Sequence, residues 1–375
     1  MWPSIARRRA APAPARLRPG PLGVELGEEA LRVLRFARTP DGELVRLHCA
    51  VRRYAGPRAE LLAQPRRLRA LLREALPGGP WPPVVTLLPP DRVRVLSVQY
   101  ELHAAQSHDE AVLVAMADRL EGALAEHVID YLPIRTRTDD GGHAALVAVA
   151  GRAEVVDWLE AWRRAGVQVS HLEIGPLALR RLVAAMMPPG RHDNVLVLNF
   201  GRTASWLTML SGRRLLFDQR LALGEEGLLR SIAEALDTTA EQARELVRGY
   251  GLADAPPAPE AGLLVSGDEV AATLRDIVKP QLARLREAIN QALIYAAAET
   301  RGAPVQRIHV LGALADWRGL VALLSDLVHI PVGLLDPLAA FAPVDDAPAC
   351  AAAEGPWLAL AAGLALRGLE AGDGD

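Results

Sequence analysis

Two stretches of the sequence share one pattern, and this pattern restricts the fold more than any other feature. Residues 22–36 read LGVELGEEALRVLRF and residues 195–210 read VLVLNFGRTASWLTML. In each stretch an apolar strand leads to a polar residue, an apolar residue and a glycine, after which a second apolar strand returns. Two matching hairpins indicate an internal duplication and therefore a fold with two related halves.

The first half continues with a pattern of short strands and helices. Residues 84–98 predict two strands separated by a Pro89-Pro90 break, and Ser107 with Glu110 forms a capping box that predicts a helix to about residue 127. Strands are expected at 131–138 and 144–150, followed by a helix at 153–165. This block is typical of a compact insertion.

The second half predicts a long helix over 268–300, with apolar residues at helical spacing and Pro280 inside it. A strand at 305–312, a helix at 318–328, a short strand at 331–335 and a closing helix at 356–369 follow. The alternation of strands and helices predicts an α/β fold.

Composition excludes several classes of protein. The 375 residues carry a formal net charge of −3, and no basic stripe interleaved with aromatic residues appears beyond the first twenty, which argues against nucleic-acid binding. Cys49 and Cys350 are far apart and lack CxxC spacing, so the sequence predicts neither a disulfide framework nor a zinc site. Without an apolar stretch of about 20 residues, a soluble protein in a reducing cytoplasm is expected.

Residues 1–20 combine five arginines with proline and alanine, and we expect a disordered basic tail here. Contact of this tail with an anionic membrane surface is the alternative to a solvated tail. HExxH, Walker A, GxSxG and complete GxGxxG motifs do not occur in the sequence. The sequence therefore nominates no catalytic residue and no metal ligand.

Several segments, in their order along the chain, carry a resemblance to a known family. They are LGVELG, VVTLLPPDRVRV, WRRAGVQVSHLEIGPLALRRL, VLVLNFGRTASWLTMLSGRRLLFDQRLALG, RIHVLGALADWRGLVALLSDLVHIPVGLLDP and GLALRG. Together they resemble the PilM family of type IV pilus assembly proteins and the related MshI proteins of mannose-sensitive haemagglutinin (MSHA) pili, within the actin-like ATPase superfamily.

The resemblance implies an actin-like, ribonuclease H-like α/β fold of two lobes. The first lobe would span 21–190, with a small α+β subdomain inserted at about 93–166, and the second lobe would span 191–370. A nucleotide cleft would lie between the lobes.

The resemblance also implies a function. Proteins of this family are cytoplasmic adaptors that lie at the inner membrane through their partners and bind the N-terminal cytoplasmic peptide of PilN, a bitopic membrane protein. A PilN-like partner is therefore expected, bound beside the insertion with residues 84–90 and 93–100 as lining strands. A pilus motor ATPase and a second copy of the chain are further partners that the resemblance allows.

The residues that correspond to the family's nucleotide cleft match its pattern only in part. They are Gly27, Glu28, Asn199, Gly201, Thr203, Gly224 and Gly312. Asn199 replaces an aspartate that positions magnesium, and Glu28 with Glu29 follows Gly27 where hydroxyl side chains are usual. Two like charges about 4 Å apart at an effective dielectric near 20 repel by about 4 kcal/mol, so an inward glutamate opposes phosphate binding. Alternatively, both glutamates face solvent.

Two further cleft elements depart in the same way. The ribose-contacting pair corresponds to Arg244 and Val247. The family's adenosine loop, usually a glycine pair or triplet, reads GALA at 312–315 here, where Leu314 either adds bulk beside the purine or packs in the core. We therefore expect a degenerate cleft with no firmly assigned cofactor, with ATP and magnesium as the alternative ligand. An active ATPase that gates peptide binding and a small-molecule kinase of the same superfamily are the competing hypotheses.

Overall fold

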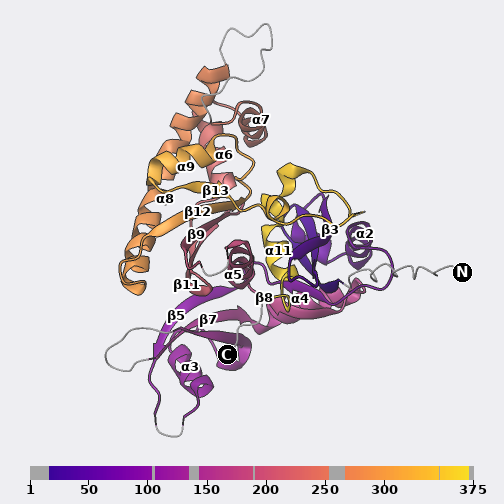
Figure 1. Ribbon diagram of the computed structural model, residues 1–375. Coiled ribbons are helices and arrows are strands. Elements are labelled where there is room, and N and C mark those ends of the chain that lie inside the picture. Colours follow the sequence, from indigo (N-terminus) through magenta and orange to yellow (C-terminus); the bar gives the residue numbers. More distant parts are fainter. Residues whose placement is uncertain are drawn as a thin grey trace, which may run out of the picture.

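The computed structural model describes residues 17–103, 106–134, 143–188, 191–252, 267–345 and 347–370. Within this part of the chain, three sheets make up the framework: two of five strands and one of three (Figure 1). The two large sheets begin with the two hairpins that the sequence predicted.

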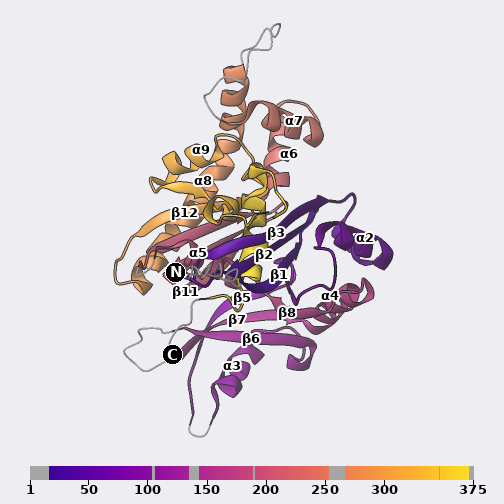
Figure 2. The ribbon, with the colours of Figure 1, turned by 45° about the vertical axis from the view of Figure 1, so that its right-hand side comes forward.

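The first sheet has the order β3-β2-β1-β4-β8. Its strands are β1 (Arg18–Leu26), β2 (Ala30–Arg38), β3 (Leu44–Arg53), β4 (Val84–Leu87) and β8 (Val169–Glu173). β1, β2 and β3 pair antiparallel, whereas β1, β4 and β8 run parallel. One face is covered by helices α1 (Arg58–Leu62), α2 (Pro65–Ala75) and α4 (Arg152–Arg164). Figure 2 shows α2 beside the β1–β3 strands.

β1 begins earlier than the expected tail allows. Residues 1–16 of that tail lie outside the described residues, but Arg18, Pro19 and Gly20 belong to β1, and Arg18 pairs with Arg38. β2 pairs with β1 as far as Arg18, with an irregularity between Pro19 and Leu22.

The insertion is a separate three-stranded antiparallel sheet of order β5-β7-β6. Its elements are β5 (Arg94–Tyr100), α3 (His108–Ala117), β6 (His127–Ile134) and β7 (His143–Gly151). The predicted capping box is present, with Ser107 and Glu110 each accepting from the other's backbone, although α3 ends ten residues before the expected end. The next helix, α4, buries Trp158 and Trp162 in the core of the first sheet rather than in the insertion.

The second sheet has the order β11-β10-β9-β12-β13. Its strands are β9 (Asn194–Phe200), β10 (Ser205–Ser211), β11 (Arg214–Leu221), β12 (Val305–Gly312) and β13 (Val332–Leu334). Its outer face packs against α6 (Glu225–Ala235), α7 (Ala240–Tyr250), α8 (Gly267–Glu299) and α9 (Leu320–Val328).

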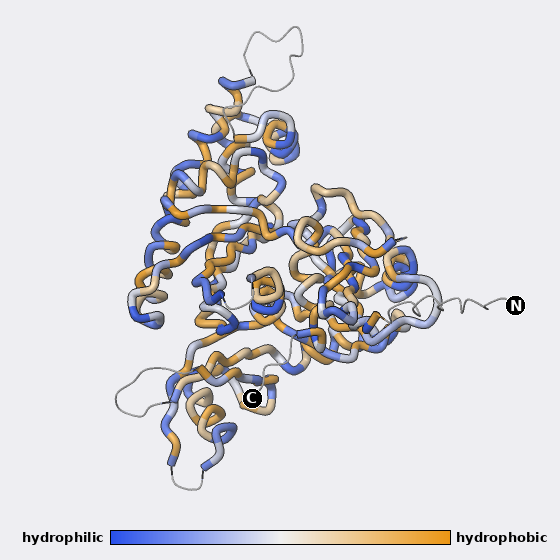
Figure 3. The backbone as a smooth tube through the Cα atoms, in the orientation of Figure 1, coloured by the Kyte–Doolittle hydropathy of each residue, from blue (hydrophilic) through white to orange (hydrophobic). Residues whose placement is uncertain are grey.

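Two helices fill the space between the large sheets. α5 (Gly175–Met186) and the closing helix α11 (Ala359–Ala365) share one core with the inner faces of both sheets. In β9, Val195 and Val197 face this inner core, while Leu196 and Leu198 face the outer helices, so the strand is apolar on both sides. Figure 3 shows hydrophobic residues gathered around α5 and α11.

α11 follows the second sheet in sequence but packs on the first. A Cβ at Gly23 of β1 would lie 2.0 Å from the Ala361 carbonyl oxygen, and one at Gly363 would lie 2.0 Å from that of Ala178 in α5. Only glycine permits such close backbone contact at these two positions. In the described residues no helix has the length and apolar character needed to span a bilayer.

Candidate functional site

A cleft of about 1180 Å³ opens between the two large sheets. It is lined by the two predicted hairpin turns, by the loop 53–58, by Pro89 to Asp91, by the end of β12 and by the segment before α11. Of the seven residues that the sequence nominated, six line this cleft: Gly27, Glu28, Asn199, Gly201, Thr203 and Gly312. The fold therefore brings together the ends of both halves of the chain.

Gly224 lies behind the second hairpin turn and does not line the cleft. A Cβ on Gly224 would lie 2.4 Å from the Arg202 carbonyl oxygen, so the residue supports the turn rather than facing a ligand. Ser205 and Thr208 are likewise structural, because their buried hydroxyls donate to the Leu223 carbonyl and the Asp218 carboxylate at 2.6 and 2.5 Å. Thr203 is exposed at the rim of the cleft.

Both hairpin turns are closed by their own backbone. The Gly27 amide donates to the Ala30 carbonyl, and the Gly201 amide donates to the Ala204 carbonyl, each at 3.0 Å. At the start of α6, the amides of Glu225 and Glu226 donate to the carbonyls of Gly201 and Arg202 at 3.1 and 2.8 Å. Amides that would bind a phosphate at a helix N-terminus are therefore already bonded within the second turn.

Glu28 and Glu29 neither point at an open phosphate site nor face only solvent. Arg58 lies 2.8 Å from Glu28 and 3.0 Å from Asp91. Arg202 bonds Glu226 and also lies 3.6 Å from Glu29. The Arg202–Glu29 pair joins the turn of the second sheet to the turn of the first, so it connects the two sides of the cleft.

Glu25, near the end of β1, lines the cleft but is committed to an internal contact. Its Oε1 accepts from Arg32 at 2.6 Å, and its other oxygen is buried without a hydrogen-bond partner. Burial raises the pKa of Glu25, and the charge of Arg32 opposes this effect only in part. Such a carboxyl is a poor ligand for hydrated magnesium.

The arginines along the first sheet hold an aromatic wall of the cleft in place. The guanidinium carbons of Arg32 and Arg53 lie 4.7 and 5.1 Å from the centre of the Trp357 ring. The Trp357 ring nitrogen donates to Asp316 at 2.9 Å. Sequence reasoning missed this cluster because its members come from β2, β3 and the segment before α11.

Of the two residues that correspond to the family's ribose-contacting pair, one lines the cleft and the other does not. Arg244 lines the cleft and lies 3.3 Å from Glu225, whereas Val247 is buried in the core of the second sheet. Burial raises the pKa of Glu225, and Arg244 opposes the shift. Leu314 is fully buried in the same core, so it adds no bulk to the cleft.

The backbone conformation and close packing at Gly312 require a glycine there, which the sequence alone did not reveal. Its φ is +88°, and a Cβ would lie 2.2 Å from the Phe200 carbonyl oxygen and 2.9 Å from the Asn199 Oδ1. The Ala313 amide donates to the same Phe200 carbonyl at 2.6 Å. Gly312 thus joins β12 to β9 beside Asn199.

These contacts bear on whether a magnesium nucleoside triphosphate fits. The described residues include no group of three histidine, cysteine, aspartate or glutamate side chains placed to hold a metal ion. A triphosphate at the turns would have to displace Glu28 and Glu29 from Arg58 and Arg202, leaving carboxylates near its own negative charge. The residues as arranged do not fit the triphosphate.

A second, much smaller cavity of about 20 Å³ lies where β5 of the insertion approaches β11. Apolar side chains such as Val93, Val95 and Leu179 surround the half-buried Asp218, which accepts the Thr208 hydrogen bond. Burial raises the pKa of Asp218 to about 7, and the hydrogen bond from Thr208 opposes the shift.

Comparisons with known proteins agree with this architecture. No protein-family model and no curated protein sequence matches the chain. Among solved structures, the PilM–PilN type IV pilus biogenesis complex is 25% identical, covers 94% of this chain and 99% of the matched chain, and has a TM-score of 0.73.

Two more distant structures share the fold. The ethanolamine utilization protein EutJ from Carboxydothermus hydrogenoformans is 13% identical over 95% of this chain and 91% of its own, with a TM-score of 0.52. The MamK double helical filament is 13% identical over 95% and 100%, with a TM-score of 0.51. The chain therefore has the two-sheet α/β fold of the actin-like ATPases, with a small antiparallel sheet inserted in its first half.

Proposed function

We propose that the protein is a cytoplasmic adaptor of a type IV pilus-like assembly machine, held at the inner membrane by the N-terminal cytoplasmic peptide of a PilN-like protein. The similarity to the PilM–PilN complex carries this proposal, because it extends over 94% of the chain at 25% identity. Service to MSHA pili in particular stays a prediction from the sequence.

The strand expected to accept the peptide is β5 rather than β4. β4 is paired with β1 on one side and β8 on the other, and all four of its residues are buried, so it offers no free edge. β5 is an edge strand of the inserted sheet, and Val95 and Leu96 on it are half-buried. An extended peptide could add to this edge through main-chain hydrogen bonds and place its apolar side chains near Val95.

The cleft supports a scaffold without ATP turnover. Its phosphate end is crossed by the ion pairs of Arg58 and Arg202, and Asn199 supplies no negative charge. The kinase alternative needs a carboxylate that accepts a proton from the acceptor hydroxyl. The aspartate that lines the cleft, Asp91, is paired with Arg58 instead.

Calorimetric titration of the full chain with a synthetic PilN-like N-terminal peptide tests the adaptor function. We expect micromolar binding, lost at least tenfold in Val95→Glu while its Tm stays that of the unmodified chain, a condition the test needs because Val95 also packs beside Asp218. Val114→Glu is the matched control, since Val114 is 65% exposed on α3 of the same insertion and should bind normally. Failure of the unmodified protein to bind would remove the adaptor proposal, and equal affinities of the two variants would remove the β5 site.

The competing function is a nucleotide-gated adaptor. It predicts that magnesium-ATP raises the stability by about 2.7 kcal/mol at 100 times Kd. We expect no shift in Tm at millimolar magnesium-ATP, either for the unmodified chain or for Asn199→Asp, because the ion pairs stay in both. A clear shift in the unmodified chain would establish the gated alternative.

A further inference from the structure

The only two cysteines of the chain meet in the folded protein, although the sequence places them near its opposite ends. Cys49 lies on β3 and is buried, and Cys350 lies in the segment before α11 and is half-buried. Cys350 lies close to Cys49, and its thiol and backbone amide can both donate to the Cys49 sulfur when that sulfur is a thiolate. The sequence spacing gave no sign of this contact.

Residues 342–344 and Pro348 are held against the outer edge of β3. The Arg46 amide donates to the Ala342 carbonyl at 2.8 Å, and the Val344 amide donates to the Arg46 carbonyl at 3.0 Å. The Cys49 thiol donates to the Pro348 carbonyl at 3.2 Å. The backbone thus positions Cys350 beside Cys49 independently of any bond between the sulfurs.

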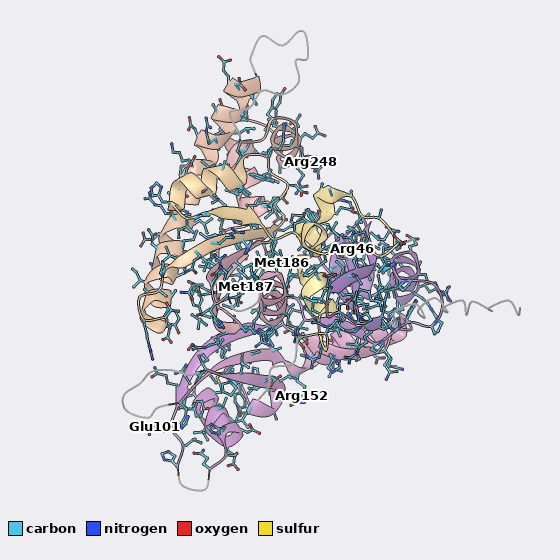
Figure 4. The ribbon with its side chains drawn as sticks, in the orientation of Figure 1. Arg46, Glu101, Arg152, Met186, Met187 and Arg248 are labelled. Atoms are coloured by element: carbon cyan, nitrogen blue, oxygen red, sulfur yellow. The ribbon has the colours of Figure 1, made fainter. Side chains whose placement is uncertain are left out.

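The surroundings favour a thiolate in this pair. Arg46 is buried beside the segment (Figure 4), and its Nε and Nη1 have no hydrogen-bond partner. The hydrogen bond from Cys350 and the charge of Arg46 lower the pKa of Cys49, against burial and the more distant Glu354. The pKa of Cys350 is raised, mainly by its hydrogen bond to Cys49, so the pair loses one proton readily and the second with difficulty.

The two cysteines lie where the chain passes from the second sheet to the first. The chain crosses from the second sheet back to the first through the segment between β13 and α11, which ends in Pro356 and Trp357 of the cleft wall. β3 also carries Arg53, which packs on Trp357. A covalent bond between Cys49 and Cys350 would fix this crossing to the first sheet.

We propose that Cys49 and Cys350 form a redox modification site, in which a hydroperoxide converts the dithiol to a reversible disulfide. This disulfide would fix the segment between β13 and α11 to the first sheet. In intracellular proteins such disulfides are typically transient and redox-sensing.

The chemistry balances without any other reactant. In the singly ionised pair the Cys49 thiolate takes up the proton of the half-buried Cys350 along their hydrogen bond, and the Cys350 thiolate so formed attacks the terminal oxygen of the hydroperoxide. An S–O bond forms, the O–O bond breaks, and the alkoxide leaves as an alcohol after taking up the proton from water. Cys49 then attacks the sulfenic sulfur; the S–S bond forms, the S–O bond breaks, and hydroxide leaves with the Cys49 proton as water. The two sulfurs are oxidised and the peroxide is reduced.

The test uses the reduced full chain exposed to hydrogen peroxide, then to N-ethylmaleimide, then to trypsin without reductant. We expect mass spectrometry to find residues 47–52 joined to the peptide that contains Cys350, and dithiothreitol to release them. Titratable thiols should fall from two to none per chain. Separate sulfinic or sulfonic acids on the two cysteines, or dimers joined through Cys350, would overturn the proposal.

Two further measurements test separately the role of Arg46 in disulfide formation and the effect of the disulfide on residues 351–358. Arg46→Gln should slow disulfide formation several-fold, whereas Arg46→Lys, which keeps the charge, should slow it less. Amide hydrogen exchange at residues 351–358 should be slower in the disulfide form than in the reduced form. Equal exchange in both forms would show that the bond does not restrain the crossing, and Cys350→Ser should show no change with peroxide.

Discussion

Gly312 is the residue at which the cleft and the second sheet depend most on one backbone conformation. Gly312→Ala places a Cβ at a φ of +88° and 2.2 Å from the Phe200 carbonyl oxygen, so β12 must move away from β9. We expect a loss of about 3 kcal/mol in the free energy of unfolding, measured by urea denaturation. Gly333→Ala, where a Cβ meets nothing within 4 Å, should change it by about 0.5 kcal/mol or less.

Asp218 should make stability depend on pH. Its pKa is about 7 in the folded protein, well above the 3.8 that is ordinary for an aspartate, so the folded state binds the extra proton. The contribution of this group to stability is therefore greatest below about pH 4, falls as pH rises to about 7, and is constant above. Because the residue is half-buried, we expect a fall of about 2 kcal/mol from this group rather than the full shift.

Asp218→Asn isolates the effect, because the amide oxygen can still accept from Thr208. Denaturation at pH 5 and pH 8 should show a smaller difference for the variant than for the unmodified chain, and the variant should be the more stable of the two at pH 8. An unchanged pH difference would show that Asp218 is ionised throughout.

Among single residues, those at the two hairpin turns have positions that local turn geometry sets. Gly27 and Gly201 close the two turns as expected, and Asn199 lies in the cleft. The partners of Glu28 and Glu29 were not predictable, because Arg58 and Arg202 reach them only after the chain has folded. Gly224 was assigned to the cleft by its place in a loop, which does not reveal which side of the turn it supports.

At the scale of elements, α8 is a 33-residue helix with a proline inside it. Pro280 is exposed and cannot donate to the carbonyl one turn earlier. Pro280→Ala restores this hydrogen bond, and we expect the free energy of unfolding to rise by about 2 kcal/mol. Lys279→Ala, a neighbouring exposed change, should alter it by about 0.5 kcal/mol or less, and a loss of stability in Pro280→Ala would contradict the argument.

Elements with strong local signals were predicted well. The hairpins, the capped start of α3 and nearly the whole of α8 follow from periodicity and capping residues. The strands β3 and β8 carry no such signal, because they are stabilised by pairing with β2 and β4 rather than by their own pattern. The closing helix was expected at 356–369, but its first turn is a 3-10 helix and α11 itself covers seven residues.

For the whole molecule, the two halves are not independent. The first sheet is completed by α11, which is the last helix in the described part of the chain and contacts β1 at Gly23. Residues 17–188 expressed alone should therefore leave the inner face of the sheet exposed and be insoluble or molten, as judged by near-ultraviolet circular dichroism. Co-expression with residues 191–375 should restore a soluble complex; a fragment that folds cooperatively alone would contradict this dependence.

Contacts between residues far apart in the chain are the part of the structure that could not be predicted from the sequence. Two lobes and an insertion follow from the duplicated hairpin and the order of motifs. The crossing of α11 to the first sheet, the Arg32–Trp357–Arg53 stack and the meeting of Cys49 with Cys350 join residues from opposite ends of the chain. No local pattern encodes such contacts.

The position of α11 also has a consequence for biosynthesis. β1 leaves the ribosome long before Gly363 is made. The inner face of the first sheet therefore lacks its α11 cover until the second half has been translated. Since chains grow by about 5–20 residues per second, this interval lasts tens of seconds. The first lobe can therefore finish folding only near the end of synthesis, and a chaperone that shields apolar surface would act mainly within that interval.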